Sequence, residues 1–142
     1  MTLKLNFFAK SDRGLIRGNN EDSGYAGSHL LILADGMGGH AAGEVASQLM
    51  VNHLEILDQD PGKEDTEALL AAAADDANEA ISEHVTAHPE TEGMGTTLST
   101  MLFNGTTFGV CHVGDSRAYL LRDGKLEQIT KDDTYVQSLV DK

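Results

Sequence analysis

The chain of 142 residues contains a single cysteine, Cys111, so it cannot form an internal disulfide. It also lacks any apolar run that approaches the roughly 20 residues of a transmembrane helix. Residues 1–11 combine few basic residues with one short apolar patch, which is too little for a secretory signal peptide. These absences make a cytoplasmic protein the expected class.

Basic residues are scarce as well. Ten lysines and arginines stand against 23 aspartates and glutamates, which gives a formal net charge of −13. The resulting negative field repels nucleic acid and anionic membrane surfaces, so neither is expected as a partner. The same field repels a phosphorylated substrate unless bound cations reverse its sign locally.

No internal repeat or low-complexity linker divides the chain, so we expect one domain or part of one. The continuous apolar run Leu30–Ala34 predicts a fully buried strand that ends at Asp35-Gly36. Residues 3–9 form a weaker candidate strand.

Two amphipathic helices are predicted after the buried strand. Apolar residues recur at helical spacing from Ala42 to Leu57, and Asp60-Pro61-Gly62 ends this first helix. The second helix is predicted over about Lys63–Ala87. The expected buried positions are Ala42, Val45, Ala46, Leu49, Met50, His53, Leu54 and Leu57 in the first helix, and Leu69, Leu70, Ala73, Ala77, Ile81 and Val85 in the second.

The period of the apolar residues changes to two from Thr96 onward. Asn104-Gly105 predicts a hairpin turn between the strands Thr96–Phe103 and Thr107–Val113. Two further strands, Arg117–Leu121 and Leu126–Thr130, would continue an antiparallel meander. The order of strands, two helices and strands predicts an α+β fold, with the helices segregated on one side of an antiparallel sheet.

Three acidic segments lie where a predicted buried element meets a turn, namely Glu21-Asp22, Asp35-Gly36 and Gly114-Asp115-Ser116. Carboxylates at strand ends are held rigidly and can converge from distant parts of a sequence. Hard cations such as Mg²⁺ and Mn²⁺ prefer such oxygen ligands, and the Gly36 carbonyl can add one because no side chain blocks the approach. Each acid alone could instead cap a helix or fill a turn, and for Asp115 this is the commoner outcome.

Two further side chains could act on a phosphate group. Arg17 lies in a glycine-bearing loop near Asp22, and a guanidinium can grip a phosphate with two parallel hydrogen bonds. The alternative for Arg17 is a solvated surface arginine. His40, beside the glycines that follow Asp35, could serve as a general acid.

A second interpretation of the glycines is a dinucleotide site. Gly36-Met37-Gly38-Gly39-His40-Ala41 matches the G-x-G-x-x-A fingerprint, and Asp58 or Asp60 would supply the distal acid. Asp35 would then place a carboxylate beside a pyrophosphate, and a helix stands where a parallel βαβ unit needs a strand, so this interpretation is the weaker one. Asp58 and Asp60 also begin like a calcium loop, but its later ligands are missing, and we expect solvated turn residues.

Four segments resemble, in order and spacing, the motifs of the bacterial branch of the metal-dependent protein serine/threonine phosphatases, the protein phosphatase type 2C family. They are Arg17-Gly18-Asn19-Asn20-Glu21-Asp22, Ala34-Asp35-Gly36-Met37-Gly38-Gly39-His40, Gly95-Thr96-Thr97 and Gly114-Asp115-Ser116-Arg117-Ala118-Tyr119. Four ordered motifs over nearly the whole chain make the resemblance specific, whereas any one of them would be weak.

The resemblance implies an antiparallel β-sandwich flanked by helices, in four layers of order α-β-β-α. It implies that Asp35 bridges two Mn²⁺ or Mg²⁺ ions and that the Gly36 carbonyl binds one of them. Glu21 and Asp22 would serve the other ion, partly through water.

The resemblance also assigns roles outside the metal pair. Arg17 would hold the substrate phosphate, and Asp115 would help to bind a third ion. Two metal ions would activate a water that hydrolyses phosphoserine or phosphothreonine, so no cysteine nucleophile is needed. The implied partners are phosphorylated proteins, including those modified by a serine/threonine kinase, in bacterial signalling.

Two departures from the family pattern stand out. Members outside bacteria carry a histidine directly after the Asp-Gly pair, where this chain has Met37, so the role of His40 as general acid stays open. The family domain is usually much longer, and its later part supplies further metal-binding aspartates. We therefore expect residues 1–142 to be the amino-terminal portion of a single phosphatase domain, incomplete at the carboxyl end. The alternative is a non-catalytic or incomplete member that acts as a metal- or partner-binding module.

Overall fold

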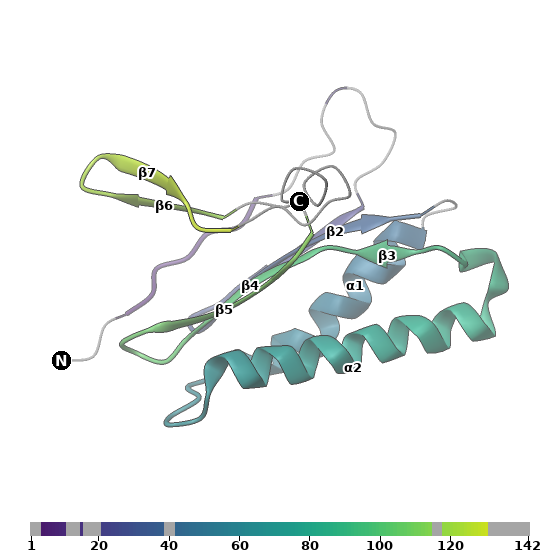
Figure 1. The fold of residues 1–142 in the computed structure, drawn as a ribbon, viewed down its shortest axis with the longest axis horizontal. Helices are drawn as coiled ribbons and strands as arrows, with labels where there is room; N and C mark the ends of the chain where they lie inside the picture. Colours follow the sequence, from purple (N-terminus) through teal and green to yellow (C-terminus); the bar gives the residue numbers. More distant parts are fainter. Residues whose placement is uncertain (1–3, 11–14, 16–20, 39–41, 115–117, 131–142) are drawn as a thin grey trace, which may run out of the picture.

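The computed structural model describes residues 4–10, 15, 21–38, 42–114 and 118–130. In Figure 1, two helices cover one face of an antiparallel sheet, which confirms the predicted α+β class. The helices are α1 (Ala42–Leu54) and α2 (Thr66–Ala87), and the short 3₁₀ turns η1 (Glu55–Leu57) and η2 (Pro89–Thr91) follow them. The sheet comprises β1 (Asp22–Ala26), β2 (Leu30–Met37), β3 (Gly95–Thr96), β4 (Leu98–Phe103) and β5 (Phe108–Val113). A separate two-stranded sheet is formed by β6 (Tyr119–Arg122) and β7 (Lys125–Gln128).

The central strand β2 is longer and less buried than its apolar run predicts. It continues through Asp35 and Gly36 to Met37, because β1 pairs with it as far as Asp35 and β3 pairs with its last two residues. Burial alternates along β2, and Leu33 is 42% exposed. The helices cover one face of the strand, so the predicted full burial is wrong for the other face.

The helices form largely where the spacing predicts them. In α1 the buried stripe is Ala42, Gly43, Ala46, Ser47, Met50, Val51 and Leu54, and the expected Val45 is exposed. Helix α2 begins at Thr66 rather than near Lys63, because the Asp65 carboxylate accepts hydrogen bonds from the amides of the first turn at 3.0 and 3.2 Å. It ends before Pro89, which cannot continue a helix. Among the described residues, no helix is long and apolar enough to cross a membrane.

The predicted hairpin at Asn104-Gly105 is confirmed by the antiparallel pair β4–β5. The Asn104 side-chain oxygen accepts from the amides of Thr106 and Thr107 at 3.0 and 2.9 Å, which closes the turn. The predicted meander does not continue beyond β5, because β6 pairs with β7 in its own hairpin. The weak strand predicted over residues 3–9 is also wrong, since residues 4–10 have no regular secondary structure.

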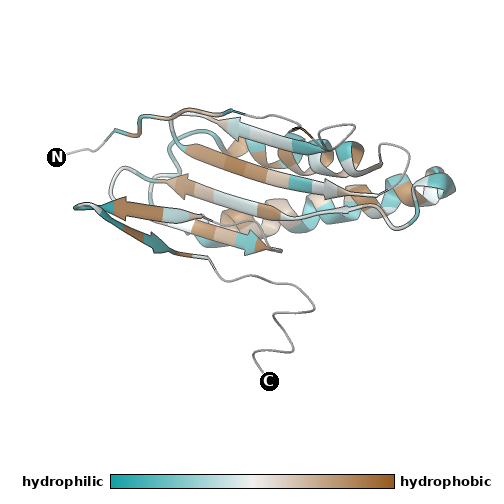
Figure 2. Ribbon diagram, turned by 90° about the horizontal axis from the view of Figure 1, so that it is seen from above, coloured by the Kyte–Doolittle hydropathy of each residue, from teal (hydrophilic) through white to brown (hydrophobic). Residues whose placement is uncertain are grey.

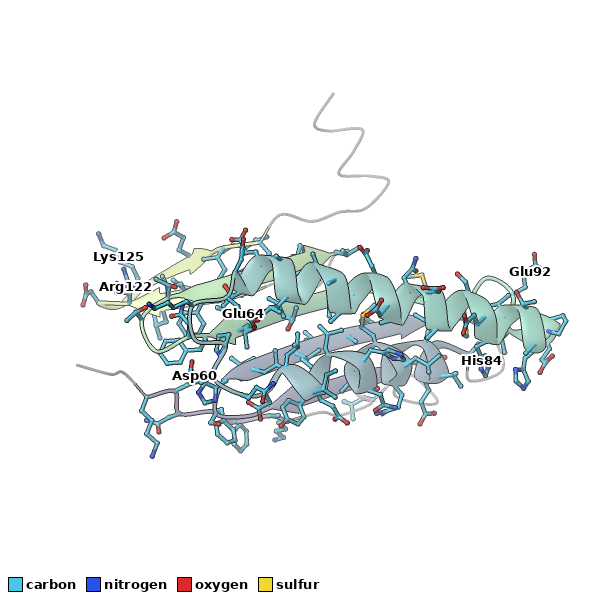
Figure 3. All side chains as sticks on the ribbon, turned by 90° about the horizontal axis from the view of Figure 1, so that it is seen from below. Asp60, Glu64, His84, Glu92, Arg122 and Lys125 are labelled. Atoms are coloured by element: carbon cyan, nitrogen blue, oxygen red, sulfur yellow. The ribbon has the colours of Figure 1, made fainter. Side chains whose placement is uncertain are left out.

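The hydrophobic core fills the space between the helices and the sheet. Its most buried large side chains are Leu30, Leu54, Leu70, Leu98 and Leu102, each at most 1% exposed. Full burial of one such side chain contributes about 1.5–3 kcal/mol. Figure 2 shows the apolar residues concentrated on the central strands, and Figure 3 shows the labelled charged and polar side chains at the ends of the elements. The core therefore fixes the position of β2, which carries Asp35.

Asp58 is a half-buried anchor and not the solvated turn residue that the sequence predicts. Its carboxylate accepts a hydrogen bond from the Tyr25 hydroxyl at 2.5 Å and one from the His29 amide at 2.9 Å. Partial burial raises the pKa of the Asp58 carboxyl, but these hydrogen bonds outweigh burial and the pKa lies below its ordinary value. Asp58 thus ties the β1–β2 turn to the end of η1. Asp60 behaves as predicted and is exposed, with its side chain accepting from the Gly62 amide at 2.8 Å.

Loss of the Asp58 carboxylate should make the free energy of unfolding depend less on pH in the acidic range. Because the folded-state pKa of Asp58 is lowered, its stabilisation is present above the unfolded pKa and is lost as the pH falls through the folded value. We expect Asp58→Ala to cost about 1.5–3 kcal/mol at pH 7 and progressively less below about pH 4. Urea denaturation from pH 7 to pH 3 measures the difference between variant and parent. Tyr25→Phe, which removes one of the two donors to Asp58, should lower the free energy of unfolding by less. A difference between Asp58→Ala and parent that stays constant with pH would contradict the role of the Asp58 carboxylate as an anchor.

Candidate functional site

Asp22 and Asp35 face each other across two neighbouring strands at one end of the sheet. Asp22 in β1 is the direct register partner of Asp35 in β2. Residues that are directly opposed in this way share a face, with Cβ atoms about 4.5–5.5 Å apart. The alternating burial of β2 places Asp35 on the face that the helices do not cover. Two of the predicted metal-binding carboxylates are thus brought together.

Glu21, which directly precedes β1, is held against the start of α1. Its backbone carbonyl accepts from the Gly36 amide at 3.2 Å and from the Ser47 hydroxyl at 2.7 Å. Its carboxylate lies over the Cα of Gly43, where an added Cβ would come within 2.3 Å of Glu21 Oε2. The first turn of a helix is electrostatically favourable for a carboxylate. The Glu21 carboxylate therefore points toward the start of α1.

Gly36 has no room for a side chain. A Cβ added at this position would lie 1.8 Å from the backbone oxygen of Gly43 in α1. The absence of a Cβ lets the first turn of α1 approach the strand directly after Asp35. Gly36 thus lies at a contact of strand with helix, and its register partner in β3 is Thr96.

Thr97 holds the backbone of Asp35 from both sides. Its hydroxyl accepts from the Asp35 amide at 3.0 Å, and its own amide donates to the Asp35 carbonyl at 2.9 Å. Thr97 is 5% exposed. Sequence reasoning assigned no role to Thr97, and its only signal was its place in the segment Gly95-Thr96-Thr97.

The remaining predicted site residues, Arg17, His40 and Asp115, lie outside the described residues. Within the described ranges, no three histidine, cysteine, aspartate or glutamate side chains gather closely enough to hold a metal ion. The donors that do meet are carboxylate oxygens, the ligand type of Mn²⁺ and Mg²⁺. The described part of the site fits such an ion in its chemistry and supplies two facing carboxylates.

A groove of about 670 Å³ lies over the sheet face opposite the helices. Its lining is largely apolar and includes Leu31, Leu33, Met101 and Val110, with Asp22 as its acidic member. The dinucleotide interpretation finds no support in this architecture. Each strand that pairs with β2 among the described residues is antiparallel to it, whereas a dinucleotide site needs a parallel βαβ unit.

Comparisons with known proteins agree with this geometry. The profile of the family described as Protein phosphatase 2C matches residues 19–139. The serine/threonine protein phosphatase PstP of Mycobacterium tuberculosis is 61% identical over 141 residues, which are 99% of this chain and 27% of PstP. A serine/threonine phosphatase of Listeria monocytogenes is 36% identical over an alignment of 144 residues, which covers 92% of this chain and 56% of that phosphatase.

A solved structure is equally similar. The catalytic domain of PstP, crystallised in complex with two manganese ions, matches with a TM-score of 0.92 at 61% identity. The match covers 97% of this chain and 60% of the crystallised one. The chain therefore spans about a quarter of the curated relative and somewhat more than half of its solved catalytic domain.

Proposed function

This chain belongs to the protein phosphatase 2C family, and we propose that it forms the amino-terminal portion of a single domain that hydrolyses phosphoserine and phosphothreonine in proteins. The observation that carries the proposal is the pair Asp22 and Asp35, directly opposed on the uncovered face of the sheet. Two opposed carboxylates place oxygen ligands of the type that Mn²⁺ and Mg²⁺ prefer next to each other. A cation-binding role explains why two carboxylates occupy facing positions.

The proposed ligands extend from this pair. Asp35 would bridge two Mn²⁺ or Mg²⁺ ions, with the Gly36 carbonyl on one and Glu21 and Asp22 on the other. The manganese ions in the similar PstP catalytic domain support the choice of metal. When bound, such ions lower the pKa of a coordinated water and neutralise charge on the phosphate.

The protein's own residues would position the reactants. Thr97 holds the Asp35 backbone, and the contact of Gly36 with Gly43 fixes the strand against α1. Arg17 would grip the substrate phosphate, Asp115 would help to bind a third ion, and His40 would donate a proton to the leaving group. Phosphorylated proteins, including kinase products, are the proposed substrates, and the cytoplasm is the proposed location.

Metal removal tests the proposal most directly. We expect the protein that carries the complete catalytic domain to hydrolyse an aryl phosphate and a phosphothreonine peptide in millimolar Mn²⁺. Turnover should fall to the uncatalysed rate after chelation and return when Mn²⁺ is added back, because the carboxylates alone repel the anionic substrate. Turnover that persists through exhaustive chelation would reject the two-metal mechanism.

One observation favours a second candidate, a non-catalytic member that binds metal or a partner. The described residues do not by themselves bring together three histidine, cysteine, aspartate or glutamate side chains that could hold a metal ion. The same assay separates the two functions, since a binding module would take up Mn²⁺ in calorimetry without turning over either phosphate ester.

A further inference from the structure

The strand pairing beside β2 is interrupted between Leu33 and Gly36. β4 pairs with β2 through Leu33↔Ser99, β3 pairs with it through Gly36↔Thr96, and both pairings follow the same register. That register places Asp35 opposite Thr97, which belongs to neither strand. The interruption therefore falls opposite the residue proposed to bridge the metal ions.

At this interruption the Thr97 hydroxyl takes the place of the Thr97 backbone carbonyl as a hydrogen-bond acceptor. The Asp35 amide donates to the Thr97 hydroxyl at 3.0 Å, whereas a regular ladder would use the Thr97 carbonyl. That carbonyl instead accepts from the Thr96 hydroxyl at 2.8 Å. The Thr97 amide still donates to the Asp35 carbonyl at 2.9 Å, so the two residues remain joined by two bonds.

The Thr97 methyl group makes a second contact. Gly114 has a φ of +107°, and a Cβ added there would lie 2.5 Å from Thr97 Cγ2. Gly114 directly precedes Asp115 in the chain. One buried side chain thus touches the backbone of Asp35 with its hydroxyl and the residue before Asp115 with its methyl.

We propose that Thr97 is a positioning residue, whose hydroxyl sets the backbone orientation of Asp35 and hence the direction of its carboxylate. The proposal rests on the proposed metal role of Asp35. Groups that orient metal ligands typically change metal affinity or activity 10–100-fold when they are removed. The Thr97 hydroxyl accepts a hydrogen bond from one amide, that of Asp35. Loss of this hydroxyl should therefore change metal affinity more than it changes the free energy of unfolding.

Two substitutions at Thr97 separate its two contacts. Thr97→Val removes the hydroxyl and keeps the shape, and Thr97→Ser keeps the hydroxyl and removes the methyl. We expect Thr97→Val to weaken Mn²⁺ binding, measured by calorimetry on the complete catalytic domain, by about 10–100-fold. Without metal, hydrogen exchange at the Asp35 amide should be faster in this variant. Thr97→Ser should stay within about threefold of the parent in both measurements, because the hydroxyl is retained.

Thr100→Val is the matched control for loss of a buried hydroxyl. Thr100 lies in β4, is 1% exposed, and its hydroxyl donates to the Leu31 carbonyl at 2.9 Å, away from Asp35. We expect Thr100→Val to lower the melting temperature and leave Mn²⁺ affinity unchanged. Parent-like Mn²⁺ binding by Thr97→Val would overturn the inference. A loss of Mn²⁺ affinity in Thr97→Ser or in Thr100→Val as large as that in Thr97→Val would also overturn it, since the Thr97 hydroxyl would then not be the cause.

Asp35→Asn, measured beside these variants, distinguishes failure of the inference from failure of the proposed function. If Asp35→Asn loses Mn²⁺ binding and Thr97→Val does not, the positioning role of Thr97 alone is wrong. If Asp35→Asn binds Mn²⁺ like the parent, the proposed metal role of Asp35 is wrong and the inference falls with it.

Discussion

Asp35→Asn is expected to lower Mn²⁺-dependent turnover by at least about a hundredfold while the protein stays folded. The effect should exceed the 10–100-fold typical of groups that only support a ligand, because Asp35 is proposed to touch both ions. Its side chain lies on the uncovered face of β2, so the substitution does not disturb the core. Steady-state hydrolysis of an aryl phosphate measures the loss of turnover.

The thermal stability of the same variant provides a sharper test. Without metal, Asp35→Asn should unfold at about the same temperature as the parent, because its side chain lies on the face of β2 that the helices do not cover. Added Mn²⁺ should raise the melting temperature of the parent and leave that of the variant nearly unchanged. Asp76→Asn, an exposed position in α2, is the charge-matched control and should respond like the parent. Equal Mn²⁺-induced shifts in Asp35→Asn and parent would remove Asp35 from the metal site.

Gly36→Ala is expected to destabilise the fold by about 3 kcal/mol or more. The new Cβ would lie 1.8 Å from Gly43 O and 2.4 Å from Gly43 C, and both are backbone atoms that no side-chain rotation can move. Strand β2 or the first turn of α1 must therefore shift. Urea denaturation at pH 7 measures the change in the free energy of unfolding.

Gly24→Ala is the control for the same chemical change in a neighbouring strand. An added Cβ at Gly24 would lie 3.4 Å from the Ile32 backbone oxygen, an ordinary contact. We expect a change within about 0.5 kcal/mol, since alanine also reduces the entropy of the unfolded chain. If Gly36→Ala were as well tolerated as Gly24→Ala, the described contact between β2 and α1 would be wrong.

The sequence predicts those elements that depend on neighbours along the chain. Spacing of apolar residues identifies both helices, and Asn104-Gly105 identifies the β4–β5 hairpin, because these signals are local. The facing of Asp22 and Asp35 is less local. Their places at the ends of predicted elements and the order of the motifs indicated only that these acids can converge. The predicted roles of Arg17, His40 and Asp115 remain predictions, since these residues lie outside the described part of the chain.

The features that sequence reasoning missed depend on contacts between distant residues. Asp58 looked like a turn residue because its donors, Tyr25 and His29, lie about 30 positions earlier in the chain. β2 looked fully buried because its composition is apolar, whereas burial depends on which face the helices cover. Thr97 looked like an ordinary strand residue, and only the pairing with Asp35 reveals the interrupted ladder.

The contact of Asp35 with Thr97 closes a long loop of the chain, because 62 positions separate the two residues and both helices lie between them. The entropy lost on closing a chain segment grows only with the logarithm of its length, so doubling the segment costs about 0.6 kcal/mol more. The free energy of bringing Asp35 to Thr97 is therefore nearly independent of how many residues connect α1 with α2. Residues 59–64 lie in that connection and are mostly exposed. Extra residues inserted there should therefore disturb the pairing of Asp35 with Thr97 little.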